Sequence, residues 1–176
     1  WLPLPHVLML PFAWNDFLWH TGLAGSIVSM IAYVLGVVFF YKLLQVLTHN
    51  TVASFIGTFI FALNPNLLYL QTTPMTEALL LTSIIIACYY LACFIETDAI
   101  KDLILCGIFV ACSTLIRYDG WFLFICLSIL IPIWVYKLHG KKRAESSTLL
   151  FLAAGGFGIG LWIIWNLIIF GDPLYF

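Results

Sequence analysis

Charged residues are scarce in this 176-residue chain, in which Asp, Glu, Lys and Arg make up 9% of the total. Soluble globular domains carry about 25% charged residues. The chain is also 64% hydrophobic, with a mean hydropathy of +1.10. This composition excludes a soluble globule and indicates a membrane protein. The formal net charge of −1 argues against a nucleic acid as partner.

Signatures of soluble enzymes are missing as well. The chain has no GxGxxG or Walker motif, no HExxH pair and no GxSxG nucleophile elbow. Their absence counts against nucleotide-driven chemistry. The five cysteines lie in apolar stretches and form no CxxC pair, and no histidine lies near them at metal-binding spacing. We therefore interpret them as small packing residues and predict no metal site.

Long apolar stretches are what the chain does contain. A membrane-spanning helix needs about 20 apolar residues. Six stretches approach that length: 23–44, 52–72, 77–95, 103–117, 120–136 and 148–170. They predict an all-α fold, a polytopic transmembrane helical bundle of about six membrane helices, over residues 23–176. Residues 1–22 are rich in proline and tryptophan, and tryptophan favours the membrane interface, so we expect an outer interfacial segment there.

Pro65 and Thr76 mark where a helix is expected to break and where another is expected to begin. Pro65 lacks a backbone donor, which predicts a kink or a helix end within the second stretch. Thr76 is expected to cap the third helix, and Glu77 in its first turn suits the helix dipole.

The fourth and fifth stretches are nearly fused. Residues 103–116 would form about 21 Å of helix, less than a hydrocarbon core of about 30 Å. Residues 117–120 must then turn the chain, and we expect Gly120 to supply the backbone freedom. This charged turn lies at or below the headgroup level, so it needs a polar cavity or an ion-pair partner.

The positive charges are distributed asymmetrically. Six of the seven Lys and Arg residues fall in alternate polar breaks, namely Lys42, Lys101, Lys137, Lys141, Lys142 and Arg143. Short loops rich in Lys and Arg stay in the cytoplasm, so the remaining breaks should face outward. Those outward breaks hold Arg117 together with Asp16, Glu77, Asp119 and Asp172. A functional site is therefore expected at the outer face.

Arg117 and Asp119 are the sharpest candidate residues. The planar guanidinium of arginine presents several donors that fit phosphate oxygens, so Arg117 could bind a phosphate from the outer side. The simpler alternative is a local ion pair with Asp119 that neutralises the turn. Glu77 is a candidate partner for Arg117 or an active-site polar group, unless it is only a carboxylate at a helix start.

His6 and Asn64 complete the candidate set. His6 follows a Pro-Leu-Pro run at the outer interface, where contact with a ligand or phosphate competes with a structural role. Asn64 flanks Pro65, where substrate binding competes with the simpler role of ending a helix.

Four short stretches resemble segments of known proteins. They are WLPLPH at residues 1–6, residues 63–66 through 76–77, LIRYDGW at residues 115–121, and GDPLYF at residues 171–176. All four resemble outer-side segments of the membrane-embedded glycosyltransferases of the GT-C superfamily, closest to the protein O-mannosyltransferase and aminoarabinose-transferase-like group. The third is similar to an Arg-Tyr-Glu-Gly-Trp pattern, and the fourth to a Gly-Asn-Pro-Leu-Tyr motif.

This resemblance implies an integral-membrane, inverting glycosyltransferase. It would move a sugar from a polyprenyl-phosphate donor to a protein, lipid or glycan acceptor on the extracytoplasmic side. The membrane would be the plasma membrane of a prokaryote or the ER membrane, with the site facing the outside or the lumen. Arg117 would contact the donor phosphate, while Glu77 and Asp119 would position it or orient sugar hydroxyls. Some members of the superfamily use a divalent cation and others do not; no cofactor follows from the sequence.

The resemblance also concerns the catalytic base. In this superfamily the general base is an Asp or Glu in the first outer loop, and the match places most of that loop upstream of Trp1. The catalytic base is therefore expected outside this chain, which reads as a segment of a longer protein.

Two other functions remain open. A secondary transporter or lipid-linked-sugar flippase would also combine charges with broken helices, but transporter charges gather near the midplane. The polar residues here cluster at the outer edge, which favours an enzyme acting on an outer-leaflet substrate. A structural membrane subunit is the third alternative, and it should tolerate loss of Arg117.

Overall fold

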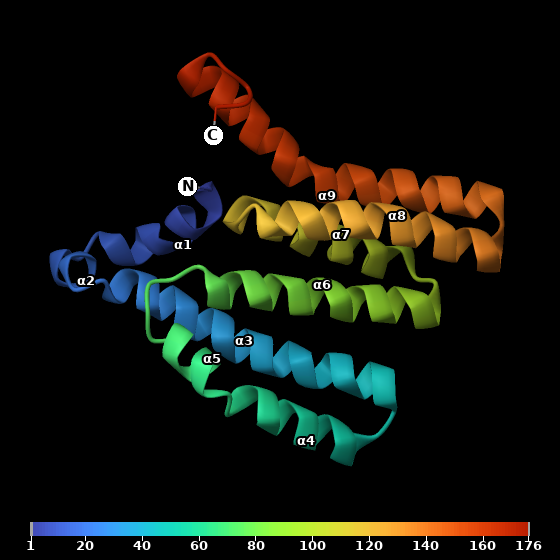
Figure 1. The fold of residues 1–176 in the computed structure, drawn as a ribbon, viewed down its shortest axis with the longest axis horizontal. Helices are drawn as coiled ribbons and strands as arrows, with labels where there is room; N and C mark the ends of the chain where they lie inside the picture. The colour runs from blue at the N-terminus through green and yellow to red at the C-terminus, as the bar shows by residue number, and fades with distance from the viewer. Residues whose placement is uncertain (1, 176) are drawn as a thin grey trace.

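The computed structural model describes residues 2–175, which form helices and no strands (Figure 1). The helices are α1 (Pro3–Ala13), α2 (Asp16–His20), α3 (Leu23–Thr48), α4 (Thr51–Ala62), α5 (Pro65–Leu70), α6 (Glu77–Thr97), α7 (Ile100–Ile116), α8 (Asp119–His139) and α9 (Lys141–Phe170). Helices α3, α6, α7, α8 and most of α9 run along one common axis. The fold is therefore the all-α helical membrane bundle that the sequence predicts.

The lengths of the helices refine the predicted spans. Within residues 2–175, four helices are long and apolar enough to cross a membrane, namely α3, α6, α8 and α9. The predicted second span is broken, since α4 ends at Ala62 and α5 begins at Pro65. The predicted fourth span is α7, which has 17 residues. The six predicted membrane helices therefore correspond to the four long helices, the short α7 and the α4–α5 pair.

Small residues allow α3 and α6 to approach closely. Gly25, Ala32 and Gly36 are buried on one face of α3. A Cβ on Gly36 would lie 2.7 Å from the hydroxyl of Thr82 in α6, and that hydroxyl donates to the carbonyl of Ala32 at 2.7 Å. Small residues at helix interfaces and hydrogen bonds between helices are typical of membrane bundles. The α3–α6 contact therefore holds the first half of the bundle together.

The apolar core lies among α6, α7, α8 and α9. Its buried members are Ala87, Phe94, Leu103, Cys106, Val110, Leu127, Ile131, Val135, Ala144 and Phe151. Large apolar side chains are also exposed on the outside of these helices, among them Ile129, Leu130 and Phe157. An exposed apolar patch of this extent marks a surface made for another apolar phase, which for this composition is lipid.

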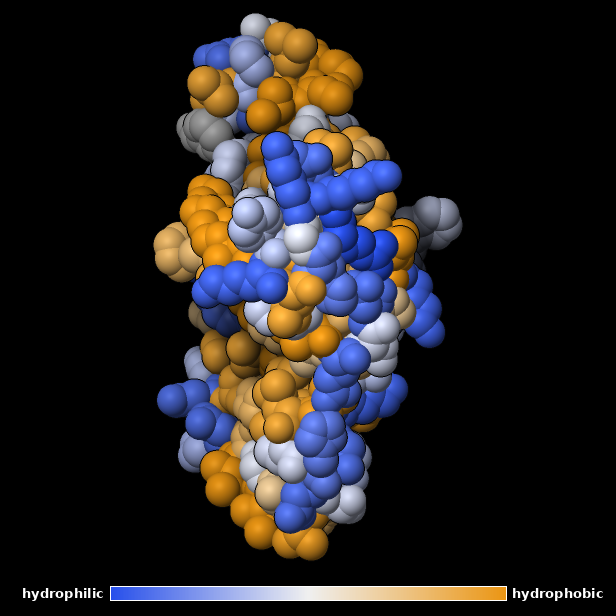
Figure 2. All heavy atoms as spheres, turned by 90° about the vertical axis from the view of Figure 1, so that its right-hand side faces the viewer, coloured by the Kyte–Doolittle hydropathy of each residue, from blue (hydrophilic) through white to orange (hydrophobic). Residues whose placement is uncertain are grey.

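The polar breaks sort to two ends of the bundle. The inner end holds the α3–α4, α6–α7 and α8–α9 turns, together with the six cations that the sequence groups (Figure 1, right). Figure 2 looks at this end and shows many hydrophilic side chains gathered there. The outer end holds α1, α2, the 71–76 loop and the α7–α8 turn. The assignment of the inner end to the cytoplasm stays a prediction from the charge rule.

Within residues 2–22, the chain forms α1 and α2 ahead of the first long helix, α3. Helix α1 packs against α3 and α7, and Leu2 and Pro5 are buried in that contact. Trp14 and Trp19 are exposed beside α2. The position of α1 at the outer end suits an interfacial segment, and the division at residue 22 stays a prediction.

The α7–α8 turn corrects one expectation. Arg117 is extended, with φ −151° and ψ 156°, and ends α7; α8 begins at Asp119. Gly120 has no positive φ and already belongs to α8. A Cβ on Gly120 would overlap the backbone carbonyl of Ser113. The expected role in backbone freedom was therefore wrong, because Gly120 serves the close approach of α8 to α7.

Candidate outer-end anion site

Arg117 forms ion pairs with two carboxylates at the outer end. Its Nη1 lies 2.7 Å from Oε1 of Glu77, and its Nε lies 2.9 Å from Oδ2 of Asp119. Glu77 begins α6 and Asp119 begins α8, while Arg117 follows the last residue of α7. The guanidinium therefore joins three helices, and the local pair with Asp119 coexists with the longer-range pair with Glu77.

Arg117 stays charged in this setting. The hydrogen bond to Asp119 raises the pKa of Arg117 above its ordinary value; desolvation opposes the rise, and the negative charge of Glu77 adds to it. The side chains of Arg117 and Glu77 are each 40% exposed, and that of Asp119 is 64% exposed. Water therefore screens these pairs, which orient the guanidinium more than they stabilise the fold.

Glu77 is placed by the start of α6. It is the first helical residue, where a carboxylate suits the positive end of the helix dipole. Thr76 is the N-cap residue, as expected, but its side chain forms no capping hydrogen bond. Its backbone has helical angles, with φ −85° and ψ −7°, rather than the extended angles typical of a cap.

Two serines of α3 hold the loop that leads to Glu77. Ser26 donates to the carbonyl of Thr72 at 3.0 Å, and Ser29 donates to the carbonyl of Met75 at 2.9 Å. Because these bonds satisfy backbone carbonyls that no helix would satisfy, they fix the 71–76 loop on α3. The loop in turn fixes where Glu77 meets Arg117.

A cavity of about 510 Å³ opens beside Arg117. It is lined by Leu2, Pro5, His6, Thr76, Ile116, Arg117, Tyr118 and Asp119. The structure thus brings His6 from α1 to the same cavity as Arg117 and Asp119, with Glu77 bonded to Arg117. We call this space the outer cavity.

Asn64 is placed elsewhere. Its side-chain oxygen accepts the backbone N–H groups of Asn66 and Leu67 at 2.9 and 3.4 Å, which caps α5. Asn64 does not line the outer cavity. The structure favours the simpler of its two predicted roles, and substrate binding by Asn64 stays a prediction without a contact to support it.

An aromatic cavity of about 410 Å³ adjoins the outer cavity and shares His6 and Tyr118 with it. It lies between α1 and the second half of α9. Its further lining residues are Pro3, Val7, Leu10, Trp162, Trp165, Asn166, Phe170 and Tyr175. Sequence reasoning had singled out the stretches that hold Pro3 and Tyr175, but it missed the α9 residues, because nothing in the pattern shows that α9 bends. Figure 1 shows the bend. It follows a run with Gly155, Gly156, Gly158 and Gly160, and glycines weaken a helix locally.

Asn166 is the buried polar residue of the aromatic cavity. It is 0% exposed, and its Nδ2 donates to the carbonyl of Tyr175 at 2.9 Å. Its Oδ1 has no hydrogen-bond partner among residues 2–175.

Metal-ligating groups do not cluster in the part of the chain that the structure describes. No three His, Cys, Asp or Glu side chains between residues 2 and 175 are grouped so that they could hold a metal ion. At the outer end, the carboxylates of Glu77 and Asp119 both bond to Arg117.

Comparison with known proteins identifies the family. A family model described as dolichyl-phosphate-mannose-protein mannosyltransferase matches residues 17–167. The chain belongs to this family. It is a segment of a GT-C-type, mannosyltransferase-like membrane glycosyltransferase, as the resemblance implied. The match spans Glu77, Arg117 and Asp119 and begins after His6. No match was found among curated proteins or among solved structures.

Proposed function

We propose that this chain binds the polyprenyl-phosphate sugar donor of an extracytoplasmic membrane glycosyltransferase, with the donor phosphate at Arg117. One observation carries this proposal. The one Lys or Arg residue at the outer end of the bundle lines a cavity there, held by carboxylates from two further helices. A donor that arrives with its own phosphate needs such a cation and no nucleotide-binding loop.

The charges of the site decide how a phosphate would enter. Arg117 contributes +1, and Glu77 and Asp119 contribute −2, so the cluster carries −1 before a ligand binds. We propose that the phosphate takes the place of Asp119 on Nε. Asp119 is 64% exposed and can turn to water. Glu77 keeps Nη1, since its Oε2 is buried. Nη2, which has no partner among residues 2–175, then completes a two-pronged contact with the phosphate.

The adjoining aromatic cavity suits the lipid part of the donor. Its walls are mainly apolar side chains of α1 and α9, and it shares His6 and Tyr118 with the outer cavity. Isoprenoid units next to the phosphate would bury apolar surface there, while the sugar would lie toward His6 and the released Asp119. The leaving lipid phosphate would be stabilised by Arg117 as the sugar departs.

The proposed reaction also needs a catalytic base, which we assign to a loop outside residues 1–176. The acceptor hydroxyl needs a positioned carboxylate to take its proton. Glu77 stays engaged with Arg117, and the released Asp119 turns to water rather than being held in position. We propose that an Asp or Glu of an outer loop encoded upstream of Trp1 takes this role, with inversion at the sugar carbon. Reading that coding sequence tests the point, because a loop without a carboxylate would remove it.

The proposed function is tested with the full protein in nanodiscs. Labelled mannose is supplied on polyprenyl phosphate, and its transfer to an acceptor peptide is measured for the wild type, Arg117→Ala and Arg117→Lys. Removal of one preorganised charge-stabilising donor lowers turnover by about 100- to 1000-fold, which is the loss expected for Arg117→Ala. Arg117→Lys should retain a fraction, because lysine keeps the charge but not the fork.

The same preparation separates the alternatives. Insertion should be unchanged in both variants, and stability should fall by no more than about 1 kcal/mol, since the pairs of Arg117 are partly exposed. Unchanged transfer in Arg117→Ala would remove Arg117 from the site. Uptake of a labelled solute by proteoliposomes, without consumption of the lipid-linked sugar, would replace the transferase with a transporter.

A further inference from the structure

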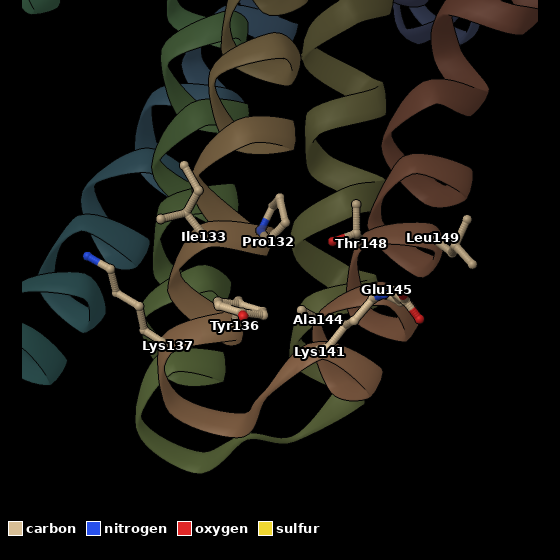
Figure 3. Close-up of a pocket in the computed structure, with 9 residues that line it drawn as sticks. All are labelled: Pro132, Ile133, Tyr136, Lys137, Lys141, Ala144, Glu145, Thr148 and Leu149. Atoms are coloured by element: carbon tan, nitrogen blue, oxygen red, sulfur yellow. Dashed lines mark ion pairs between the residues drawn. The ribbon is translucent and has the colours of Figure 1, made fainter.

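A third cavity lies at the inner end of the bundle, away from Arg117. It is an open groove of about 1000 Å³ between the last turns of α8 and the first turns of α9. It is lined by Pro132, Ile133, Tyr136, Lys137, Lys141, Ala144, Glu145, Thr148 and Leu149. Figure 3 shows the two sets of residues on the two helices, with the Tyr136 ring lying between them. We call this space the inner groove.

The inner groove combines two kinds of surface. Ile133 and Leu149 are 50% and 69% exposed and, together with Pro132, give it apolar walls. Nearer the α8–α9 turn at Gly140, its lining becomes basic, with Lys137 in the last turn of α8 and Lys141 at the start of α9. The groove therefore passes from apolar walls to a cationic mouth within two helical turns.

Neither lysine is held by a strong ion pair among residues 2–175. Lys141 lies 3.8 Å from Glu145, and both side chains are more than 60% exposed, so this pair contributes little. Lys137 has no ion pair among residues 2–175, and Figure 3 shows its side chain extended away from α9. Both ammonium groups stand on long flexible stems. Nearby Arg143 differs, since it is bonded to Asp98.

We propose that the inner groove is a binding site for one anionic phospholipid. An acyl chain would lie against Pro132, Ile133 and Leu149, and the phosphate would be held by Lys141 and by Lys137, whose flexible side chain would turn toward α9. Charge complementarity selects this occupant: Lys137, Lys141 and Glu145 give the lining a net charge of +1, which an anionic headgroup neutralises and a zwitterionic headgroup does not. By the charge rule the inner end faces the cytoplasm, where anionic lipids are enriched. This site is independent of the proposed donor site.

The test uses the full protein in phosphatidylcholine nanodiscs that contain a photoactivatable phosphatidylglycerol. Crosslinked peptides are mapped by mass spectrometry for the wild type, for Lys137→Gln/Lys141→Gln and for Lys42→Gln/Lys101→Gln. All four lysines are exposed and lie at the inner end, so the two double variants change the same charge on the same face. Glutamine keeps most of the side-chain length, and none of these changes touches the core.

The expected result is crosslinking to α8 and α9 around the inner groove. Each lysine near an anionic surface contributes about 1 kcal/mol, which corresponds to roughly a fivefold change in the binding constant. Lys137→Gln/Lys141→Gln removes two lysines and should weaken binding by about 25-fold. Crosslinking in the groove at subsaturating lipid should fall accordingly, and it should stay unchanged in Lys42→Gln/Lys101→Gln.

Three outcomes would overturn the proposal. Equal losses in the two double variants would show diffuse attraction to the whole basic face. Equal crosslinking by a photoactivatable phosphatidylcholine would show an apolar groove without charge selection. Crosslinks confined to other helices would show that the groove holds no lipid.

Discussion

Two arginines hold opposite ends of the bundle, and their partners differ in kind. Arg143, in the first turn of α9, donates from Nη2 to Oδ2 of Asp98 at 2.9 Å and to the Asp98 carbonyl at 3.1 Å. Asp98 has a left-handed backbone, with φ 52°, in the α6–α7 turn. Arg117 bonds to two side chains from two other helices and to no backbone atom among residues 2–175, and it lines a cavity.

The difference separates a structural arginine from a candidate ligand-binding arginine. A backbone carbonyl in a fixed turn cannot move aside for a ligand, so Arg143 is committed to the turn that it holds. A carboxylate on an exposed side chain can rotate into water at little cost. Arg117 is therefore held in place and yet able to exchange a partner, whereas Arg143 is not.

The close contact of α8 with α7 at Gly120 should not tolerate added volume. In Gly120→Ala, the new methyl group would overlap the carbonyl of Ser113, which is backbone and cannot rotate away as a side chain can. Overpacking costs up to about 3 kcal/mol, so we expect a loss near that value in thermal or denaturant unfolding. Gly160→Ala is the matched control. Nothing lies within 4 Å of its Cβ position, and stability there should be unchanged or slightly higher.

Arg143→Ala is expected to lower stability and to leave sugar transfer nearly unchanged, the opposite of Arg117→Ala. Hydrogen bonds to charged groups contribute about 1.5–3 kcal/mol each. Arg143 and Asp98 are 30% and 36% exposed, so solvent screening lowers the expected loss to about 1–2 kcal/mol. Transfer per folded molecule should stay within about threefold of the wild type, a change of less than 1 kcal/mol. If sugar transfer fell as far as in Arg117→Ala, Arg143 could not be called structural in contrast to Arg117.

The smallest expected effect concerns the loop that carries Glu77. Ser29 is buried, and its hydroxyl bonds to the Met75 carbonyl. Ser29→Ala should lose about 1 kcal/mol of unfolding free energy. At the inner end, Ser146 is exposed and bonds to the Lys142 carbonyl of its own helix. Ser146→Ala should therefore stay within about 0.5 kcal/mol of the wild type. Equal effects would mean that the loop is not held by α3.

Much of the fold follows from local signals in the sequence. Apolar run length predicted the helices, Pro65 predicted the α4–α5 break, and Lys and Arg spacing predicted which turns share an end. These signals succeed because the bilayer forces backbone groups to be satisfied within a helix and keeps charges out of its core.

The candidate site was only partly predictable. Arg117 and Glu77 are 40 positions apart, and shared sidedness made their pairing only one of the roles that the sequence left open for Glu77. The approach of α1, which brings His6 to the outer cavity, and the bend of α9 depend on packing that no periodicity records. The same is true of Gly120, since close helix approach and backbone freedom both select glycine.

The unequal lengths of neighbouring helices have a geometric consequence for the acceptor. Helix α7 has 17 residues and is about 26 Å long, whereas α9 has 30 residues and is about 45 Å long. Both begin near the inner end and pack against each other, so α9 continues past the end of α7, where Arg117 lies, even with the bend in its outer half. In the proposed function, an acceptor that reaches a phosphate at Arg117 would have to pass beside this outer part of α9. A flexible, extended segment would fit beside α9 more readily than the broad surface of a folded globule.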